Sequence, residues 1–564
     1  MHRMLLALAL LLAAHCACAA ELVTISVTHL PDRWRARYQL DQPADQLRFI
    51  DDFGLRRHGR WKLQMPGFRL VAKDGNEFIE RKDGKPFREV TVGFATDTTK
   101  LDKKYPLNKT LTDGSEWLCT LHLYAAPLRH GTPAVPARFD LRFVPRKGES
   151  IVLDGQRHAG AVTWHDPLLD RGTFVYFGKL APIETQDVIA IVDPGLPRYL
   201  EQQFDDLLPK LFAYYREHTG YALNKRPVIL ITYHPQEDFN PGDSGEVLPD
   251  VIAFDFRSRK LWGARDAKNA RMSFHLLAHE AAHLWNGNRF ESVEGDAAPW
   301  MHEGGADAFA WAAARDFGVL DEDALRAEVE LNLNRCLNKL APLGVSLQDA
   351  FKQSVYELAY SCGSVMNFAA GTELHDRGGL FALWRALFGQ AEKSGERYDV
   401  GQYFATLRAL DRDGTLAAAM SDLWSRPQPD AAAALRALLA ASGIVIGPGT
   451  VPPDFERIYA RNAMQRLMWE DCAGAFSFKS GEDRFELTGL PQCHVLKNRT
   501  AAVVALAGVK VGQPLQLYAA VSKRCAEKSD VEAQLADGGG ILSLHCSQPL
   551  PAIAPYLTIT SWPH

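Results

Sequence analysis

The residues best suited to chemistry stand in the run His279-Glu280-Ala281-Ala282-His283. Two histidines four positions apart lie on the same face of a helix, one turn from each other, so both imidazoles can reach one metal ion. Glu280 follows the first histidine, and its carboxylate can act as general base on a metal-bound water. The spacing predicts a hydrolytic metal site with His279 and His283 as ligands and Glu280 as the base.

A catalytic zinc needs a third protein ligand and an open coordination position. Glu303 lies 20 positions after His283 (303 − 283), in the run Trp300-Met301-His302-Glu303-Gly304-Gly305-Ala306-Asp307, which opens another predicted helix. We expect Glu303 to complete a His-His-Glu ligand set, which favours zinc as the cofactor. One turn further on, Asp307 is expected to hydrogen-bond a ligand histidine from outside the metal's coordination shell.

Two stretches, HEAAHLWNGN over 279–288 and WMHEGGADAFA over 300–310, resemble gluzincin zinc peptidases. The resemblance is to the alanyl-aminopeptidase and glycyl-aminopeptidase families, over about residues 273–317. It implies a zinc-dependent peptide hydrolase of aminopeptidase type. Nineteen residues separate His283 from Glu303 (303 − 283 − 1), one more than the alanyl-aminopeptidase pattern usually has, which predicts an insertion in the intervening loop.

The same resemblance implies a tyrosine on a later helix that stabilises the tetrahedral intermediate. The segment 359–365 is similar to the family's Y-x-x-G pattern and makes Tyr360 the candidate donor to the oxyanion, with Tyr356 in reserve. The alternative role for Tyr360 is to anchor its helix to the core.

One family motif is missing. Aminopeptidases of this kind carry a G-x-M-E-N segment whose glutamate binds the free amine of the substrate. The corresponding stretch here is Gly242–Pro249, which lacks M-E-N. Its Glu246 could take that role, but the pattern favours a carboxylate in a solvated loop. The substrate-binding residues therefore stay unassigned.

The chain of 564 residues is too long for one compact domain. Short alternating segments with turn residues between them, including Thr120–Tyr124, predict an all-β N-terminal domain. A helix over Pro197–His218 is expected to be kinked or split by Pro209. The run Ile446–Gly449 with the following prolines reads as a linker.

The predicted organisation is therefore multidomain. The expected parts are a signal peptide (1–20), an N-terminal β domain (21–190), a thermolysin-like α+β catalytic domain (191–320), a helical domain (321–447) and a small α/β domain (455–564). The last part resembles a divergent PDZ domain, as found in glycyl aminopeptidases, through Leu487–Leu490, Val503–Val511 and the following helix and strand. A generic small α/β domain held by disulfides is the alternative.

The first twenty residues predict export. A basic start, the apolar run Leu5–Ala14 and the small residues Ala17-Cys18-Ala19 are typical of a secretory signal peptide. The residues around Cys16 and Cys18 fit a lipoprotein signal poorly, which disfavours a lipid anchor. We find no later segment apolar enough to span a membrane, so the sequence predicts a periplasmic or secreted protein.

Seven cysteines follow the leader, and an oxidising compartment allows disulfides between them. The four near the C-terminus allow three pairings. The pairings we favour are Cys336–Cys362, Cys472–Cys493 and Cys525–Cys546, which leave Cys119 over.

The charge balance limits the partners. With 63 basic and 68 acidic residues, the formal charge is -5, which argues against nucleic acid as the main partner. A peptide or protein substrate is expected, and the oligomeric state stays open. Two alternatives stay open as well. One is a non-catalytic, metal-stabilised scaffold that binds peptides or proteins, and the other is a zinc hydrolase of a non-peptide bond such as an epoxide.

Overall fold

The computed structural model describes residues 21–50, 57–96, 105–133, 137–166, 172–237, 242–473, 476–497 and 499–563. The predicted signal peptide lies outside these residues. The chain divides into two compact units, Met1–Glu291 with Phe309–Val319, and Ser292–Ala308 with Leu320–His564. The division passes within one continuous helix, α6 (Pro299–Asp316). Our five-part division is finer than this and stays a prediction.

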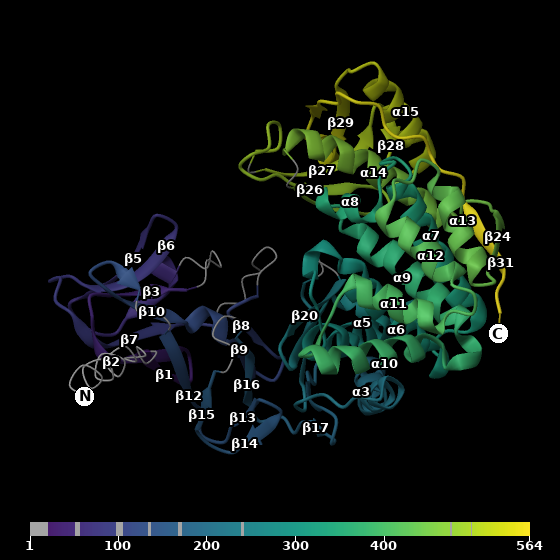
Figure 1. The fold of residues 1–564 in the computed structure, drawn as a ribbon. Coiled ribbons are helices and arrows are strands. Elements are labelled where there is room, and N and C mark those ends of the chain that lie inside the picture. The colour runs from purple at the N-terminus through teal and green to yellow at the C-terminus, as the bar shows by residue number, and fades with distance from the viewer. Residues whose placement is uncertain are drawn as a thin grey trace, which may run out of the picture. The chain divides into compact units, whose positions relative to one another are not determined.

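The N-terminal part of the first unit is built from strands, as predicted (Figure 1). Its six-stranded sheet consists, in spatial order, of β15 (Val162–His165), β12 (Ala137–Val144), β1 (Glu21–His29), β2 (Trp34–Ala44), β7 (Phe87–Phe94) and β4 (Lys62–Leu63). Strand β1 is parallel to β12 and antiparallel to β2. Alternate residues of β1, namely Val23, Ile25 and Val27, are fully buried, which is the period of a strand with one face on the core.

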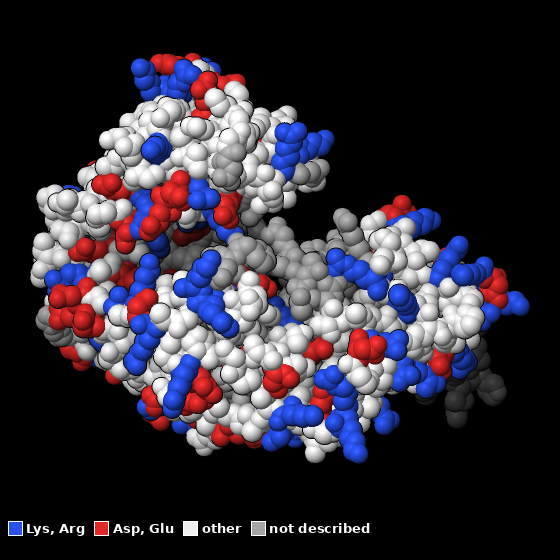
Figure 2. Space-filling model, turned by 180° about the vertical axis from the view of Figure 1, so that it is seen from behind, with Lys and Arg blue, Asp and Glu red and all other residues white. Residues whose placement is uncertain are grey.

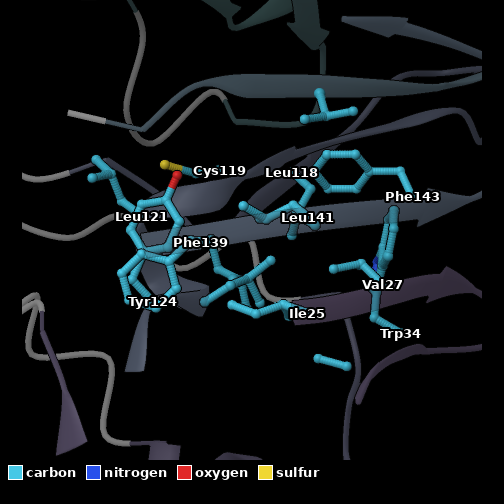
Figure 3. Close-up of a cluster of buried hydrophobic side chains, with 14 of the residues drawn as sticks. Ile25, Val27, Trp34, Leu118, Cys119, Leu121, Tyr124, Phe139, Leu141 and Phe143 are labelled. Carbon is cyan, nitrogen blue, oxygen red and sulfur yellow. The ribbon is translucent and has the colours of Figure 1, made fainter. Parts of the chain in front are cut away.

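Two five-stranded sheets complete this part. One contains β11 (Thr132–Pro133), β10 (Ala125–Arg129), β3 (Gln46–Phe49), β6 (Asn76–Arg81) and β5 (Phe68–Lys73). The other contains β14 (Gln156–His158), β13 (Ser150–Leu153), β16 (Phe174–Gly178), β9 (Glu116–Cys119) and β8 (Asn108–Thr110). Figure 3 shows Ile25 and Leu141 of the first sheet in one buried cluster with Leu118 of β9, so the sheets share a core. A short helix, α2 (Arg57–Arg60), lies between β3 and β4.

The prediction of a strand over Thr120–Tyr124 was wrong. Residues Thr120–Leu123 form a short 3-10 helix, η1. All four are buried, so the segment has no solvent face for alternate residues to occupy. The segment also joins β9 to β10, which belong to different sheets, and a helical turn gives the required change of direction.

A mixed sheet with helices follows in the first unit. Its strands are β17 (Ile183–Glu184), β18 (Ile189–Val192), β19 (Val228–His234), β21 (Val251–Arg257) and, at the edge, β20 (Gly242–Leu248). The helices are α3 (Arg198–Thr219), α4 (Arg259–Trp262), α5 (Ala267–His283) and the π-helical turn η2 (Leu284–Arg289). Strands β18, β19 and β21 are parallel, whereas β20 is antiparallel to β21.

Two further predictions need correction in this region. Helix α3 is not split at Pro209 but continues through it, because its buried apolar side chains, Phe204 and Leu208 among them, outweigh the cost of about 3 kcal/mol for an internal proline. The stretch Gly242–Pro249 is not a loop: β20 pairs with β21 along its whole length. This pairing gives the backbone groups on that side of β21 their hydrogen-bond partners.

The second unit is mainly helical, as expected for the C-terminal half. Its helices after α6 are α7 (Glu322–Leu340), α8 (Leu347–Lys352), α9 (Glu357–Glu373), α10 (Gly379–Ala391), α11 (Val400–Leu410), α12 (Thr415–Ser425) and α13 (Ala431–Ala441). Short elements accompany them: β22 (Glu291–Ser292), η3 (Gly295–Ala297), η4 (His375–Arg377), η5 (Glu392–Ser394) and β23 (Arg397–Tyr398). The segment predicted as a linker is instead strand β24 (Val445–Pro448), which pairs with β31 (Leu557–Ser561). The C-terminal strand returns to this segment and supplies its backbone partners.

The C-terminal part has its own core, formed between helices and an antiparallel sheet. The helices are α14 (Pro453–Asp471), α15 (Pro514–Ala526) and the short η6 (Ala536–Gly538). The strands are β25 (Ser477–Ser480), β26 (Phe485–Thr488), β27 (Thr500–Leu506), β28 (Val509–Lys510), β29 (Val531–Leu535) and β30 (Ile541–Leu544). This is a small α+β arrangement, and its resemblance to a PDZ domain stays a prediction.

All three favoured disulfides are confirmed: Cys336–Cys362, Cys472–Cys493 and Cys525–Cys546. Cys119 is free and buried. Among the described helices, none is long and apolar enough to cross a membrane. Figure 2 shows basic and acidic side chains interspersed over one face of the molecule, in keeping with the balanced composition.

Candidate metal centre

Helix α5 places the two predicted histidine ligands. Asp266 caps the helix by accepting a hydrogen bond from the Asn269 amide, and an apolar face of α5 is buried. His279 and His283 are 8% and 6% exposed, and their Nε2 atoms lie 3.1 Å apart. Two nitrogens bound to one tetrahedral zinc at about 2.05 Å would lie about 3.3 Å apart. The observed spacing therefore fits a shared metal ion.

Glu303 lies on α6, in the stretch Ser292–Ala308 that belongs to the second unit, whereas His279 and His283 belong to the first. Two imidazoles and one carboxylate are the donor set of a catalytic zinc site. The role of these three residues as metal ligands stays a prediction.

Asp307 lies one turn after Glu303 and is 6% exposed. A histidine has two ring nitrogens, so a ligand histidine can offer one to a metal and the other to a carboxylate. The supporting role of Asp307 stays a prediction.

Sequence reasoning missed Asn286, which lies in the π-helical turn that follows α5. Its Oδ1 accepts a hydrogen bond from Nδ1 of His283 at 3.3 Å, and its side chain is fully buried. Because an amide oxygen only accepts, the proton sits on Nδ1, and Nε2 carries the lone pair that can bind a cation. The spacing of three residues from His283 is the signal that could have revealed it.

Glu280 lies against the edge strand β20. A Cβ atom added to Gly245 would be 2.5 Å from Cγ, Cδ and Oε1 of Glu280. Since such contacts essentially do not occur, only glycine leaves room here for the carboxylate. The Glu280 side chain is half-buried, with the β20 backbone as one wall. The role of Gly245 could not be seen in the sequence, because it depends on the pairing of β20.

Tyr105, from the β domain, reaches the same strand. Its hydroxyl donates to the carbonyl oxygen of Val247 at 2.9 Å. Burial raises the pKa of Tyr105 to about 12, and the charges of Cys119, Glu246 and Glu280 add to this effect. Tyr105 therefore lies near two carboxylates of the candidate site, although nothing in the sequence around it indicated such a role.

Helix α9 carries Tyr360 and begins just after Tyr356, and the two side chains are 44% and 48% exposed. A side chain as exposed as Tyr360 does not anchor a helix to the core. The same helix packs backbone to backbone on α6, because a Cβ at Gly304 would overlap the main chain of Gly363. The glycines that follow Glu303 and Tyr360 thus set the distance between their helices.

Comparisons with known proteins bear on the fold. No protein-family model matches the sequence, and no curated protein matches it either. Among solved structures, an aminopeptidase N family protein from Idiomarina loihiensis matches with a TM-score of 0.62 and 13% identity, over 96% of this chain and 98% of that one. A zinc metallopeptidase from Deinococcus radiodurans matches with a TM-score of 0.37 and 14% identity, over 77% of this chain and 94% of that one. Leukotriene A4 hydrolase from Saccharomyces cerevisiae gives a TM-score of 0.41 and 13% identity, over 80% and 73%.

The first of these matches extends over nearly the full length of both chains. At 13% identity it concerns the fold alone. It agrees with the β-rich N-terminal part and the helical C-terminal half found here. The chain therefore has the fold of an aminopeptidase N family protein.

Proposed function

We propose that this protein is a zinc-dependent peptide hydrolase of aminopeptidase type. The observation that carries the proposal is the pair His279 and His283 on α5, whose Nε2 atoms lie 3.1 Å apart, with Glu280 between them on the same helix. Glu303 is proposed as the third ligand. The fold shared with an aminopeptidase N family protein supports the proposal.

The residues present fit zinc. Two imidazoles and one carboxylate are the donor set of many hydrolytic zinc sites, and the Asn286 contact places the lone pair of His283 on Nε2. His279, His283 and Glu303 would hold the ion, with Asp307 and Asn286 orienting the imidazoles. When bound, zinc supplies Lewis acidity, which makes water a stronger acid and polarises a carbonyl group.

The remaining chemistry belongs to side chains of this protein. The Glu280 carboxylate takes a proton from the attacking water and later gives it to the leaving amine. The Tyr360 hydroxyl, on an exposed face of α9, donates a hydrogen bond to the oxygen on which negative charge develops. Glu280 is only half-buried, so its carboxylate can exchange protons with the solvent.

Aminopeptidase specificity requires a group that binds the free amine of the substrate. Glu246 is the candidate, because it lies on the edge strand β20 and its charge, like that of Glu280, acts on Tyr105. An extended peptide can pair with an exposed strand edge, which would align its N-terminus along β20. The position of Glu246 in a strand, rather than in a loop, supports this assignment.

The cellular location follows from two features. Three disulfides agree with an oxidising compartment, and the leader over residues 1–20 predicts export. We therefore propose a periplasmic or secreted enzyme, with a C-terminal PDZ-like domain as its final part.

The test combines metal content with turnover. Zinc would be measured by mass spectrometry in the wild type, Glu303→Ala and Glu280→Gln, and cleavage of a mixed peptide library would be followed on the same samples. We expect one zinc per wild-type chain, loss of zinc and cleavage in Glu303→Ala, and loss of cleavage alone in Glu280→Gln. Glu322→Ala is a matched control, because Glu322 forms an exposed ion pair with Arg326, and such pairs contribute little to stability.

Other outcomes would overturn the proposal. A wild-type protein without zinc would refute the metal site. Zinc without cleavage of any peptide would refute the peptidase, and ester and epoxide substrates would then separate a different hydrolase from a binding scaffold. Full activity in Glu280→Gln would refute the role of the general base.

A further inference from the structure

A cavity of about 240 Å³ lies within the second unit, between α7, α9 and α14. Its charged lining residues are Arg335 and Lys339 of α7, Glu357 of α9, and Arg461 of α14. Tyr360, the proposed oxyanion donor, lines it as well. The disulfide between Cys336 and Cys362 joins α7 to α9 directly behind this wall, so two of the three helices are covalently held in place.

The cavity has an excess of positive charge. Three cations and one carboxylate line it, a difference of +2 (3 − 1). Glu357 contacts Lys339 at 2.8 Å and Arg461 at 3.5 Å, so this carboxylate is shared by two of the cations. Arg335 has no hydrogen bond or ion pair with any residue that the structure describes, and its side chain is exposed.

Arg335 and Arg461 line the same cavity. Arg335 stays exposed on one side, but partial desolvation by the surrounding helices lowers its pKa, and the charge of Arg461 lowers it further, whereas Glu328, Glu357 and Asp307 raise it. An anion between Arg335 and Arg461 would relieve this repulsion. The effect of Asp307 also indicates that Arg335 lies near α6, the helix that carries Glu303.

The size and chemistry of the cavity limit its ligand. At about 30 Å³ per water it holds about eight waters, and it is smaller than the roughly 300–1,000 Å³ of sites for drug-sized molecules. A guanidinium matches the two oxygens of a carboxylate in a planar, forked geometry. The space therefore suits one carboxylate and the residue that carries it, but not a large ligand.

We infer that this cavity, here called the carboxylate subsite, binds a carboxylate of the peptide substrate while Tyr360 acts on the scissile bond. The inference rests on the proposed function and deepens it, because it names short peptides that carry a free carboxylate as the preferred substrates. The carboxylate can belong to the C-terminus of the peptide or to an acidic side chain.

The test compares three peptides that differ only in this group: Leu-Ala-Ala, its C-terminal amide, and Leu-Ala-Glu amide. A charge-assisted contact predicts a kcat/KM about tenfold to a hundredfold higher for the peptide with the recognised carboxylate than for Leu-Ala-Ala amide. A preference for the free acid identifies the C-terminus, and a preference for Leu-Ala-Glu amide identifies the side chain. Equal values for all three peptides would overturn the inference.

In Arg335→Gln, kcat/KM for the peptide with the recognised carboxylate should come close to kcat/KM for Leu-Ala-Ala amide, so that their ratio is near one. Zinc content and melting temperature should stay unchanged. The matched control is Arg457→Gln, one turn before Arg461 on α14, because Arg457 pairs with Asp454 and Glu482 and does not line the cavity. The control should keep the wild-type ratio. A wild-type ratio in Arg335→Gln would also overturn the inference.

A binding measurement separates this inference from the proposed function. Calorimetry with Ala-Ala, Ala-Ala amide and Ala-Glu amide on Glu280→Gln protein requires no turnover. Tighter binding of a carboxylate-bearing ligand, lost when Arg335→Gln is added, supports the carboxylate subsite even if no peptide is cleaved. Equal binding of all three dipeptides would refute the subsite, and a peptidase without this preference would remain.

Discussion

Replacing Gly245 by alanine should separate catalysis from folding. The new Cβ would be 2.5 Å from three atoms of the Glu280 side chain, whereas ordinary contacts begin at 3.4 Å. The carboxylate must therefore retreat by about 0.9 Å (3.4 − 2.5). The clashing atoms belong to a flexible side chain and not to backbone, so Glu280 moves and the fold does not.

The structure sets the size of the effect. A misplacement of about 1 Å in a reacting group costs roughly a factor of 10² in rate. Complete loss of a general base costs about 10²–10⁴, which is the upper limit for this substitution. Alanine within a strand is about 0.5–1 kcal/mol more favourable than glycine, so the stability of Gly245→Ala should not fall. We expect kcat to decrease about a hundredfold at unchanged stability.

The assay measures peptide cleavage, zinc content and the unfolding midpoint on the same preparation. Gly160→Ala is the matched control, because an added Cβ there meets nothing within 4 Å and the backbone is not left-handed. The control should retain wild-type kcat. If Gly245→Ala binds zinc and cleaves peptides within twofold of the wild-type rate, then either Glu280 is not the base or β20 does not hold its carboxylate in place.

Three further predictions follow from contacts of named residues. Tyr105→Phe removes the hydroxyl that donates to Val247, a hydrogen bond worth about 1 kcal/mol. We expect kcat/KM to fall about fivefold at unchanged zinc content, and an unchanged kcat/KM would contradict this prediction. Gly304→Ala forces the backbones of α6 and α9 apart, so the free energy of unfolding should fall by about 1–3 kcal/mol and the melting temperature should fall with it. A variant as stable as the wild type would disprove the tight packing. In the β domain, burial raises the pKa of Glu149, but hydrogen bonds from His29 and Arg146 outweigh it and bring the pKa from 4.5 to about 2. Burial lowers the pKa of His29, and bonds to two carboxylates raise it above 6.5. The stabilisation by Glu149 is lost as the pH falls from 4.5 towards 2, and the stabilisation by His29 is lost as the pH rises above 6.5. In urea unfolding at different pH, the contribution of this pair to stability should therefore be greatest between pH 4.5 and 6.5. A stability that does not change with pH would refute this prediction.

The core of the candidate site could be predicted because its determinants are local. Two histidines four residues apart share a helix face in any helix, and the apolar residues between them predict that helix. Glu303 was proposed because a catalytic zinc needs a third ligand and this acid lies 20 positions after His283 on the next predicted helix, and the family resemblance then agreed. The three disulfide pairs were chosen among several pairings that the sequence allows, and the structure contains them.

The errors arose where tertiary pairing overrides local preference. Gly242–Leu248 is rich in glycine and acidic residues, which have low β-propensity, yet it is a strand because β21 offers a free edge. Ile446 and its neighbours look like a linker, but β31, more than a hundred residues later, pairs with them. Neither partner can be identified from the segment itself.

The residues that the sequence did not reveal all act through such distant contacts. Gly245 matters only because β20 lies against Glu280, and Tyr105 only because its hydroxyl reaches Val247. Arg335 becomes a candidate for substrate recognition only once α7, α9 and α14 enclose a cavity. The reacting groups are therefore encoded within single helices, whereas the groups that position and select the substrate come from separate elements. A homologue could keep H-E-x-x-H and the metal while changing its preference through residues such as Arg335 and Arg461, because the packing of α6 on α9 at Gly304 and Gly363 does not depend on them.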